Sequence, residues 1–222
     1  MRRTLTWDVT LKVVMRLFRD VTKAWIRARR RDRYYRRAKA EGYRSRAAYK
    51  LLQINERFGT IRPGDVVVDL GAAPGGWSQV AGDLVGAKGR VVALDMVPMA
   101  PLERVTFLRG DLREEAVLTE LLSVIPEGAD VVLSDMSPKL SGNKSLDHGR
   151  SIELANTAFL FAEGALKARG NLVVKVFQGD MYDDFRRKLA SAFETCKGFT
   201  PKASLAKSSE IYLVGKGWRG AR

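Results

Sequence analysis

The chain has 222 residues, of which 45% are hydrophobic, so it can bury the core of one α/β-sized domain and cannot be wholly disordered. Its formal charge of +14 favours a polyanionic partner, nucleic acid above all. One cysteine excludes an internal disulfide, and one histidine excludes a His/Cys zinc cluster and an ordinary Ser-His-Asp triad. No apolar run approaches the roughly 18 residues of a membrane span. We therefore expect a cytoplasmic monomer without a metal and without an integral membrane segment.

The positive charge is concentrated at the N-terminus, because residues 1–46 hold sixteen Lys or Arg against four acids. Within this arm, apolar residues recur every three or four positions, which predicts an amphipathic helix; they are Trp7, Leu11, Val14, Phe18, Val21 and Trp25. Three interpretations remain open: a helix packed on its own domain or a partner, an organellar targeting peptide, or a helix on a phosphate backbone or anionic membrane. We assign residues 1–30 to a basic extension and residues 31–222 to the main domain.

A denser basic cluster follows the helix and contains two tyrosines, Tyr34 and Tyr35. Guanidinium groups interleaved with aromatic rings offer both phosphate contacts and stacking surfaces for RNA. A merely solvated basic helix is the alternative. The RNA-contacting candidates are Arg29, Arg30, Arg31, Arg33, Arg36 and Arg37.

From residue 45 onwards, short apolar strands alternate with helical stretches. Ser45 is expected to cap a helix over 47–58. Strands are expected over 66–70, 90–94, 105–108, 130–133, 171–177 and 211–214, and further helices near 77–85, 113–124, 150–168 and 182–195. Residues 140–150 read as a polar loop in which His148 is exposed or stabilises the loop, and Cys196 reads as a partly buried small residue. This order predicts a doubly wound α/β sheet.

A glycine-rich turn, DLGAAPGGW over residues 69–77, follows the first expected strand. Such a turn between a strand and a helix lets a ligand approach the backbone closely. Ala73 stands where a dinucleotide-binding G-x-G-x-x-G fingerprint needs glycine, and no G-K-[ST] follows as in a P-loop. The turn alone is a weak signal, since tight strand–helix packing also favours glycine.

An acid stands at the end of each of the next three expected strands in the first half of the sheet: Asp95, Asp111 and Asp135. Ligands of open α/β sheets bind at the carboxyl ends of the strands. Three carboxylates there suit the ribose hydroxyls, the adenine amino group and the cationic centre of S-adenosylmethionine, whereas they would repel a pyrophosphate. The alternative is that these aspartates only cap helices.

Five strings in register, the glycine-rich turn among them, resemble the FtsJ/RrmJ (RlmE) family of ribosomal RNA 2′-O-ribose methyltransferases, in its archaeal-type form. They are YRSRAAYKL (43–51), DLGAAPGGW (69–77), SDMSP (134–138), VVKVFQG (173–179) and SSEIY (208–212). The resemblance covers roughly residues 31–215. The resemblance implies a mostly parallel, seven-stranded, Rossmann-like methyltransferase sheet whose last strands are antiparallel. It also implies methylation of a ribose, with uridine as the expected base, in large-subunit (23S-type) ribosomal RNA or a pre-ribosomal large subunit.

The same resemblance assigns the functional residues. The catalytic tetrad that it implies is matched by Lys50, Asp135, Lys175 and Glu210. The residues that it implies for S-adenosyl-L-methionine are Gly75, Trp77, Asp95, Asp111 and Asp135.

The chemistry of 2′-O-methylation requires a base, because a ribose hydroxyl must lose its proton as it attacks the methyl group. Lys175 lies in the apolar run 173–177, where burial disfavours an ammonium. Lys50 would add repulsion, whereas Asp135 and Glu210 would stabilise the cation. Lys175 is the expected general base, with Lys50 and Glu210 positioning it and the ribose and Asp135 beside the sulfonium.

Three other functions remain as alternatives. Transfer RNA 2′-O-methylation uses the same family. A non-catalytic RNA-binding ribosome-assembly factor would need only the basic arm and not a buried lysine with strand-end acids. A nicotinamide-dependent oxidoreductase is disfavoured by Ala73 in the glycine turn.

Overall fold

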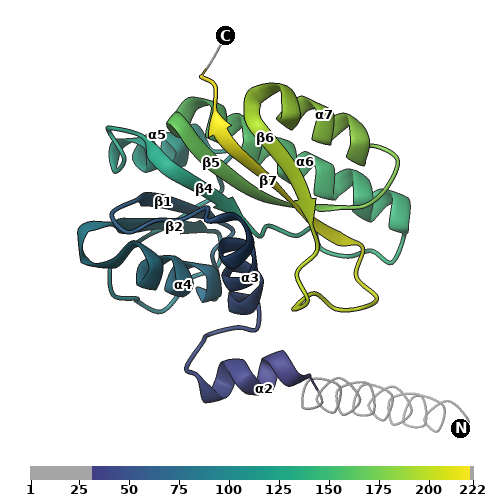
Figure 1. Cartoon of the computed structure of the whole chain (residues 1–222), viewed down its shortest axis with the longest axis horizontal. Helices are drawn as coiled ribbons and strands as arrows, with labels where there is room; N and C mark the ends of the chain where they lie inside the picture. Colours follow the sequence, from purple (N-terminus) through teal and green to yellow (C-terminus); the bar gives the residue numbers. More distant parts are fainter. Residues whose placement is uncertain (1–31, 221–222) are drawn as a thin grey trace, which may run out of the picture.

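The computed structural model describes residues 32–220 and contains one seven-stranded sheet in the order β3-β2-β1-β4-β5-β7-β6 (Figure 1). The strands are β1 (Val66–Leu70), β2 (Arg90–Asp95), β3 (Val105–Arg109), β4 (Ala129–Ser134), β5 (Leu166–Phe177), β6 (Phe193–Phe199) and β7 (Glu210–Trp218). The first five strands in the sheet order are parallel, whereas β7 is antiparallel to both of its neighbours. The expected doubly wound, mostly parallel sheet is confirmed, including its antiparallel end.

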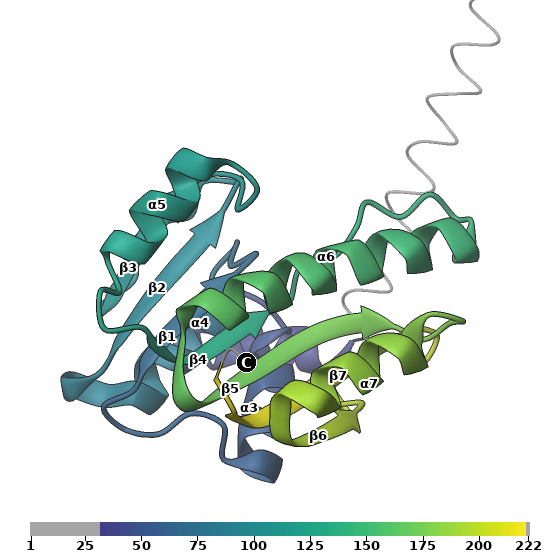
Figure 2. The same cartoon turned by 90° about the horizontal axis from the view of Figure 1, so that it is seen from above.

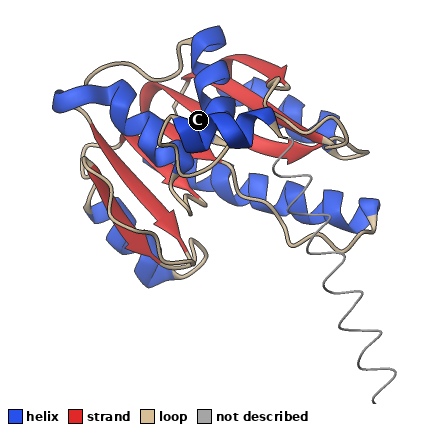
Figure 3. Cartoon of the chain, turned by 90° about the horizontal axis from the view of Figure 1, so that it is seen from below, coloured by secondary structure: helices blue, strands red, loops and turns tan. Residues whose placement is uncertain are grey.

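Helices cover both faces of this sheet (Figures 2 and 3). They are α2 (Arg33–Ala40), α3 (Ala48–Phe58), α4 (Gly76–Val85), α5 (Glu115–Ser123), α6 (Lys144–Ala165) and α7 (Tyr182–Ala192), with a 3-10 turn over Gly86–Lys88. Helices α3 and α4 pack on one face, and α5, α6 and α7 pack on the other. Both faces of the central strands are therefore buried, as their continuous apolar sequences require.

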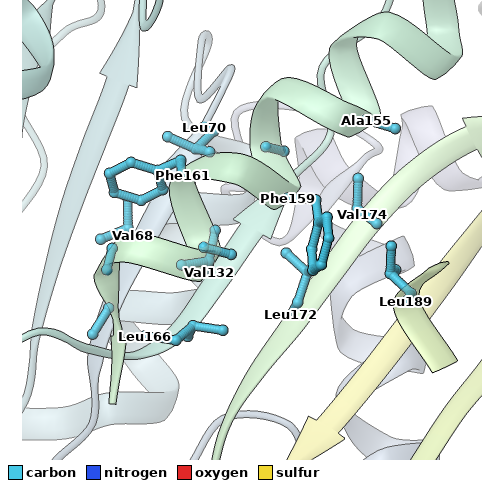
Figure 4. Packing of buried hydrophobic residues seen from close by; sticks show 14 of the residues in the cluster. Val68, Leu70, Val132, Ala155, Phe159, Phe161, Leu166, Leu172, Val174 and Leu189 are labelled. Atoms are coloured by element: carbon cyan, nitrogen blue, oxygen red, sulfur yellow. The ribbon is translucent and has the colours of Figure 1, made fainter. Parts of the chain in front are cut away.

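Successive strand residues supply two separate cores, because side chains alternate across a strand. In β1, Val67 packs with α3 and α4, whereas Val68 packs with α5 and α6. Figure 4 shows the second core, in which Phe159 and Phe161 of α6 meet the central strands. This alternation also puts Lys175 on the α3 and α4 side, between Val174 and Val176, which both belong to the other core.

Helix α2 packs against the domain. Asp32 caps it by accepting hydrogen bonds from the backbone of Tyr34 and Tyr35, and Asp32 also pairs with Arg46. Tyr34 and Ala38 are buried against Tyr49 and Ala203. Part of the basic segment is thus packed on the domain, while Arg33, Arg36 and Arg37 stay exposed. The expected helix over 7–25 and Arg29–Arg31 lie outside the described residues.

Two helix starts differ from the sequence prediction. Helix α3 begins after Ala47 without a side-chain cap, so Ser45 as its cap is wrong; the Ser45 hydroxyl packs against Gly76 instead. Helix α6 begins at Lys144 and not near residue 150. Its N-cap is Asn143, whose side chain accepts from the Leu146 backbone, so half of the expected polar loop is helical.

The C-terminal part of the domain also differs from the sequence prediction. Helix α7 stops at Ala192, and the next residues form β6, which the hydrophobic pattern did not reveal. Strand β6 lies at the edge of the sheet and pairs only with β7, so most of its residues are exposed or half-buried and it lacks an apolar run. Cys196 lies in this strand and is half-buried, as expected, and its burial raises the pKa of the thiol. Within residues 32–220, no helix is long and apolar enough to cross a membrane.

Candidate active site

A cavity of about 400 Å³ opens at the carboxyl ends of β1 to β4. All three strand-end acids line it, namely Asp95, Asp111 and Asp135. Its apolar walls come from the strand ends and from α6 and include Leu70, Leu94, Met96, Leu112, Met136 and Leu154. The cavity thus combines apolar walls with three carboxylates, in the size range of small-molecule sites.

Asp95 joins the two chain segments that border this cavity. Its Oδ2 accepts from the Ala73 backbone at 2.9 Å, and its Oδ1 accepts from the Val97 backbone at 2.8 Å. Each carboxylate oxygen keeps a second lone pair for a ligand. Asp95 therefore fixes the glycine turn and still has capacity to bind a hydroxyl group.

Asp111 lies just beyond the end of β3, the strand next to β2, and is held by Arg113. The Arg113 side chain donates three hydrogen bonds to the carboxylate, from Nε at 2.9 Å to Oδ1 and 3.1 Å to Oδ2 and from Nη2 at 2.5 Å to Oδ2, and its backbone amide donates a fourth to Oδ1. These contacts hold the pKa of Asp111 below its usual value. Asp111 is therefore a fixed anionic acceptor at the rim.

Gly75 and Trp77 are not among the residues that line this cavity. Gly75 has a φ of 104°, a conformation that favours glycine, and forms the N-terminus of α4. The Trp77 side chain is buried against Tyr212, and its indole N–H donates to the Ala47 carbonyl at 2.8 Å. The contacts of the Trp77 side chain are structural, and the assignment of both residues to the cofactor stays a prediction.

Lys175 lies near the end of β5 and is 6% exposed. Its ammonium group donates to the backbone carbonyl of Asp135 at 2.6 Å and lies 3.1 Å from Asp135 Oδ1. Asp135 directly follows β4, the parallel neighbour of β5, so strand pairing brings the two residues together. A buried amine beside an acid is thus fixed at the edge of the cavity.

Lys50 and Glu210 form a second charged pair in the same place, with Lys50 Nζ 2.6 Å from Glu210 Oε1. Tyr212 joins the two pairs: its hydroxyl accepts from Lys50 at 3.1 Å and donates to Asp135 Oδ1 at 2.7 Å. Burial and the two nearby carboxylates raise the pKa of Tyr212 well above its ordinary value, so the hydroxyl stays protonated. The structure therefore brings all four predicted tetrad residues together.

Tyr212 is a fifth residue of this network, with no role predicted from the sequence. The residue was visible in the SSEIY string, but a tyrosine in a strand is more often a core residue. Its role depends on the pairing of β5 with β7, which places Tyr212 directly opposite Lys175.

Residues 43–218 match the family model of the FtsJ-like methyltransferases. The chain belongs to this family. It is 50% identical over 201 residues to the ribosomal RNA large subunit methyltransferase E of Acinetobacter baumannii, covering 90% of this chain and 93% of the relative. It is 52% identical over 188 residues to the enzyme of the same name from Methanosarcina acetivorans, covering 84% of this chain and 68% of that relative.

A solved structure also resembles this FtsJ-like methyltransferase. It is a putative ribosomal RNA methyltransferase from Plasmodium falciparum, with a TM-score of 0.74 and 29% sequence identity, and the match covers 81% of this chain and all of the other. The fold and the family resemblance expected from the sequence are therefore both confirmed.

One further acid of this FtsJ-like methyltransferase lies beneath the glycine turn. Asp69, in β1, is fully buried; its Oδ2 accepts from the Ser78 hydroxyl at 2.6 Å, whereas Oδ1 has no hydrogen-bond partner. Burial is the main cause that raises its pKa to about 7, and Asp95 and Asp135 add repulsion. Asp69 is outside the cavity lining, so its role is distinct from that of the three rim acids.

His148 lies in α6 and is 6% exposed, so its placement in a loop was wrong, and so was the alternative that it is exposed. Its Nδ1 lies 3.0 Å from the Phe177 carbonyl, and its Nε2 accepts from the Met181 backbone at 3.1 Å. The imidazole therefore ties α6 to the segment that follows Lys175. Among residues 32–220, no three His, Cys, Asp or Glu side chains are placed to hold a metal ion.

Proposed function

We propose that this FtsJ-like methyltransferase transfers a methyl group from S-adenosyl-L-methionine to a ribose 2′-hydroxyl of large-subunit ribosomal RNA. The main support is one arrangement: the buried Lys175 and the Lys50–Glu210 pair are joined through Asp135 and Tyr212 beside a three-acid cavity. A proton-coupled methyl transfer needs an amine that takes the proton and a cavity that holds the cofactor. Here one aspartate, Asp135, borders both.

The cavity suits S-adenosylmethionine in volume and in chemistry. Asp95 is expected to accept from ribose hydroxyls of the cofactor, Asp111 from its adenine end, and Asp135 to lie beside its positive centre. The bound cofactor would supply an electrophilic methyl group on a sulfonium. The three acids disfavour a phosphate-bearing dinucleotide, because carboxylates repel phosphates.

Lys175 and Lys50 have different roles toward the acceptor ribose. Lys175 acts as the general base: once its amine is neutral, Nζ takes the proton of the 2′-hydroxyl, and the contacts with Asp135 hold it in place. Lys50, held by Glu210, orients the ribose. Tyr212 links both lysines through Asp135 and fixes their relative geometry.

The proposed RNA follows from the relatives. Two relatives, 50% and 52% identical to this chain over the aligned residues, are named as ribosomal RNA large subunit methyltransferases. We propose the same substrate class here, with uridine as the base and the exposed arginines of α2 among the RNA contacts. This would place the enzyme in the cytoplasm, where ribosomes of a bacterium or an archaeon are assembled.

The test uses full-length protein, methyl-labelled S-adenosylmethionine and three RNAs: large-subunit RNA, pre-ribosomal large subunits and transfer RNA. We expect label in the large-subunit substrates, mapped to a single 2′-O-methylated ribose, and none when that nucleotide is replaced by its 2′-deoxy form. Methylation of transfer RNA alone would change the proposed substrate from ribosomal RNA to transfer RNA. RNA binding without transfer to any RNA would indicate a non-catalytic assembly factor and overturn the proposal.

A further inference from the structure

The guanidinium of Arg44 donates hydrogen bonds to three backbone carbonyls from two different loops. It reaches the Ala100 carbonyl at 2.6 Å, the Pro101 carbonyl at 2.6 Å and the Pro74 carbonyl at 3.3 Å. Pro74 belongs to the glycine turn after β1, and the other two residues belong to the loop between β2 and β3. Arg44 thus connects two loops that are otherwise about 25 residues apart along the chain.

The side chain is also packed tightly against the glycine turn. A Cβ atom on Gly75 would lie 2.9 Å from Arg44 Nη1, 2.7 Å from Met99 Sδ and 3.1 Å from a Leu102 methyl group. Only glycine leaves room for the guanidinium and the loop at this point. The close approach to Gly75 and the three hydrogen bonds are separate observations, and both show that the Arg44 guanidinium packs between the glycine turn and the loop after β2.

The backbone around Arg44 is fixed to α4 as well. The Arg44 amide donates to Gln79 Oε1 at 3.1 Å, and Gln79 Nε2 donates to the Gly42 carbonyl at 3.0 Å. The backbone that carries the guanidinium is therefore fixed to α4 independently of the loop.

Two side chains from outside the loop after β2 donate to its backbone: Arg44, and Arg109, whose Nε donates to the Met96 carbonyl at 3.2 Å. Pro98 and Pro101 have no N–H to donate, and Met96 and Val97 are 61% and 59% exposed. Yet Met96 lines the cavity, and Asp95, directly before it, is one of the three rim acids. The position of this loop therefore shapes one side of the cavity.

We propose that Arg44 is a positioning residue for the cofactor: it straps the loop over residues 96–102 onto the glycine turn and so preserves the cavity wall around Asp95. The inference rests on the proposed use of S-adenosylmethionine. The competing role, a contact with an RNA phosphate, would be natural for an arginine in the basic N-terminal segment. It is disfavoured because the side chain is half-buried and three of the five N–H donors of the guanidinium already meet carbonyls.

The test compares Arg44→Ala and Arg44→Lys with Arg57→Ala, which removes the same charge from an exposed position at the far end of α3. Titration calorimetry with S-adenosylmethionine should show Kd raised about tenfold or more in Arg44→Ala, since charged hydrogen bonds are lost. Arg44→Lys should fall in between, because an ammonium cannot span two adjacent carbonyls as a planar fork does. Arg57→Ala should bind like the wild type.

Two further readouts separate positioning from a general structural defect. The methyl-transfer rate of Arg44→Ala at saturating S-adenosylmethionine should return to within a few-fold of the wild type. Hydrogen exchange should become faster in residues 96–102 and stay unchanged in β4 and β5. If Arg44→Ala fails to fold cooperatively, Arg44→Lys carries the same comparison.

Failure of this inference and failure of the proposed function would give different results. An unchanged Kd for S-adenosylmethionine in both Arg44 variants, with weaker RNA binding and a flatter salt dependence, would overturn this inference and assign Arg44 to RNA. A wild-type protein that binds no S-adenosylmethionine would overturn the proposed function, and this inference with it.

Discussion

The hydroxyl of Tyr212 donates a hydrogen bond to Asp135 at 2.7 Å, although their strands β7 and β4 are not neighbours in the sheet. Strand β5 lies between them and carries Lys175, which contacts the same carboxylate. Asp135 therefore receives hydrogen bonds from an amine and from a phenol. The two donors fix one carboxylate between the three-acid cavity and the proposed base.

Tyr212→Phe should slow methyl transfer. The change keeps the buried ring against Trp77 but removes the hydroxyl that joins Lys50 to Asp135. A lost hydrogen bond to a charged group corresponds to about 1.5–3 kcal/mol, or roughly a ten- to hundredfold lower kcat. Steady-state kinetics measure it, with Tyr182→Phe on α7 as the control. Equal kcat in Tyr212→Phe and wild type would contradict the assigned link.

Lys175→Met should abolish transfer and leave the affinity for S-adenosylmethionine nearly unchanged, because Lys175 is assigned to the proton of the acceptor and not to the cofactor. Methionine fills a similar volume in the buried strand without an amine. Methyl-transfer assays and calorimetry check the two halves. Lys188→Met, on the exposed side of α7, is the matched control. Turnover like that of the wild type would remove Lys175 as the base.

Asp95→Ala should weaken cofactor affinity by about 1.5–3 kcal/mol, the range for hydrogen bonds to a charged group. Asp95 also accepts from the backbone of Ala73 and Val97, so the alanine variant loosens both loops beside the cavity. Asp95→Asn keeps one acceptor oxygen and should lose less. Calorimetry gives the values, with exposed Glu103→Ala as the control. Unchanged affinity would remove Asp95 from the cofactor site.

Asp69→Asn should change the dependence of stability on pH. The pKa of Asp69 is raised to about 7 in the fold, from an ordinary value of 3.8. Between these two pH values the folded protein holds a proton that the unfolded chain releases, so this group lowers stability as pH rises. The effect amounts to roughly 4 kcal/mol at most.

Urea unfolding from pH 4 to 8 measures this effect. The free energy of unfolding of Asp69→Asn, relative to the wild type, should rise across this range and level off above pH 7. Asp83→Asn, an exposed acid on α4, should follow the wild type. Parallel curves for Asp69→Asn and wild type would mean that Asp69 is ionised throughout.

Removal of residues 1–31 should weaken RNA binding and flatten its salt dependence, while cofactor binding survives. Each lost phosphate contact changes the slope of log K against log salt by roughly 0.7–0.9. The cut must precede Asp32, because Asp32 pairs with Arg46 and the buried Tyr34 follows it. A cut after Arg37 would remove part of the core.

A full-length variant with Arg33, Arg36 and Arg37 changed to Ala tests the exposed part of α2 separately. Salt titrations of RNA affinity measure both proteins. A truncated protein with the full-length slope would show that residues 1–31 do not bind RNA, and their apolar stripe would then serve packing, a partner or targeting.

The main features of the fold could be predicted from the sequence because they are local. Continuous apolar runs such as 66–70 mark strands that are buried on both faces, and the glycine turn marks a strand–helix junction. Strand β6 and the start of α6 escaped the prediction for the opposite reason. The edge strand has no apolar run, and α6 begins with a polar turn capped by Asn143.

The sequence by itself determined which residue types stand at the strand ends, and hence the acids Asp95, Asp111 and Asp135 and the buried Lys175. Only the tertiary structure decided how they are joined. The links through Tyr212 and Arg44, and the burial of His148, depend on strand order and on contacts between residues up to 162 positions apart. Periodicity in a sequence reports what each segment buries, but not which distant segment it meets, because that choice is made when all elements pack together.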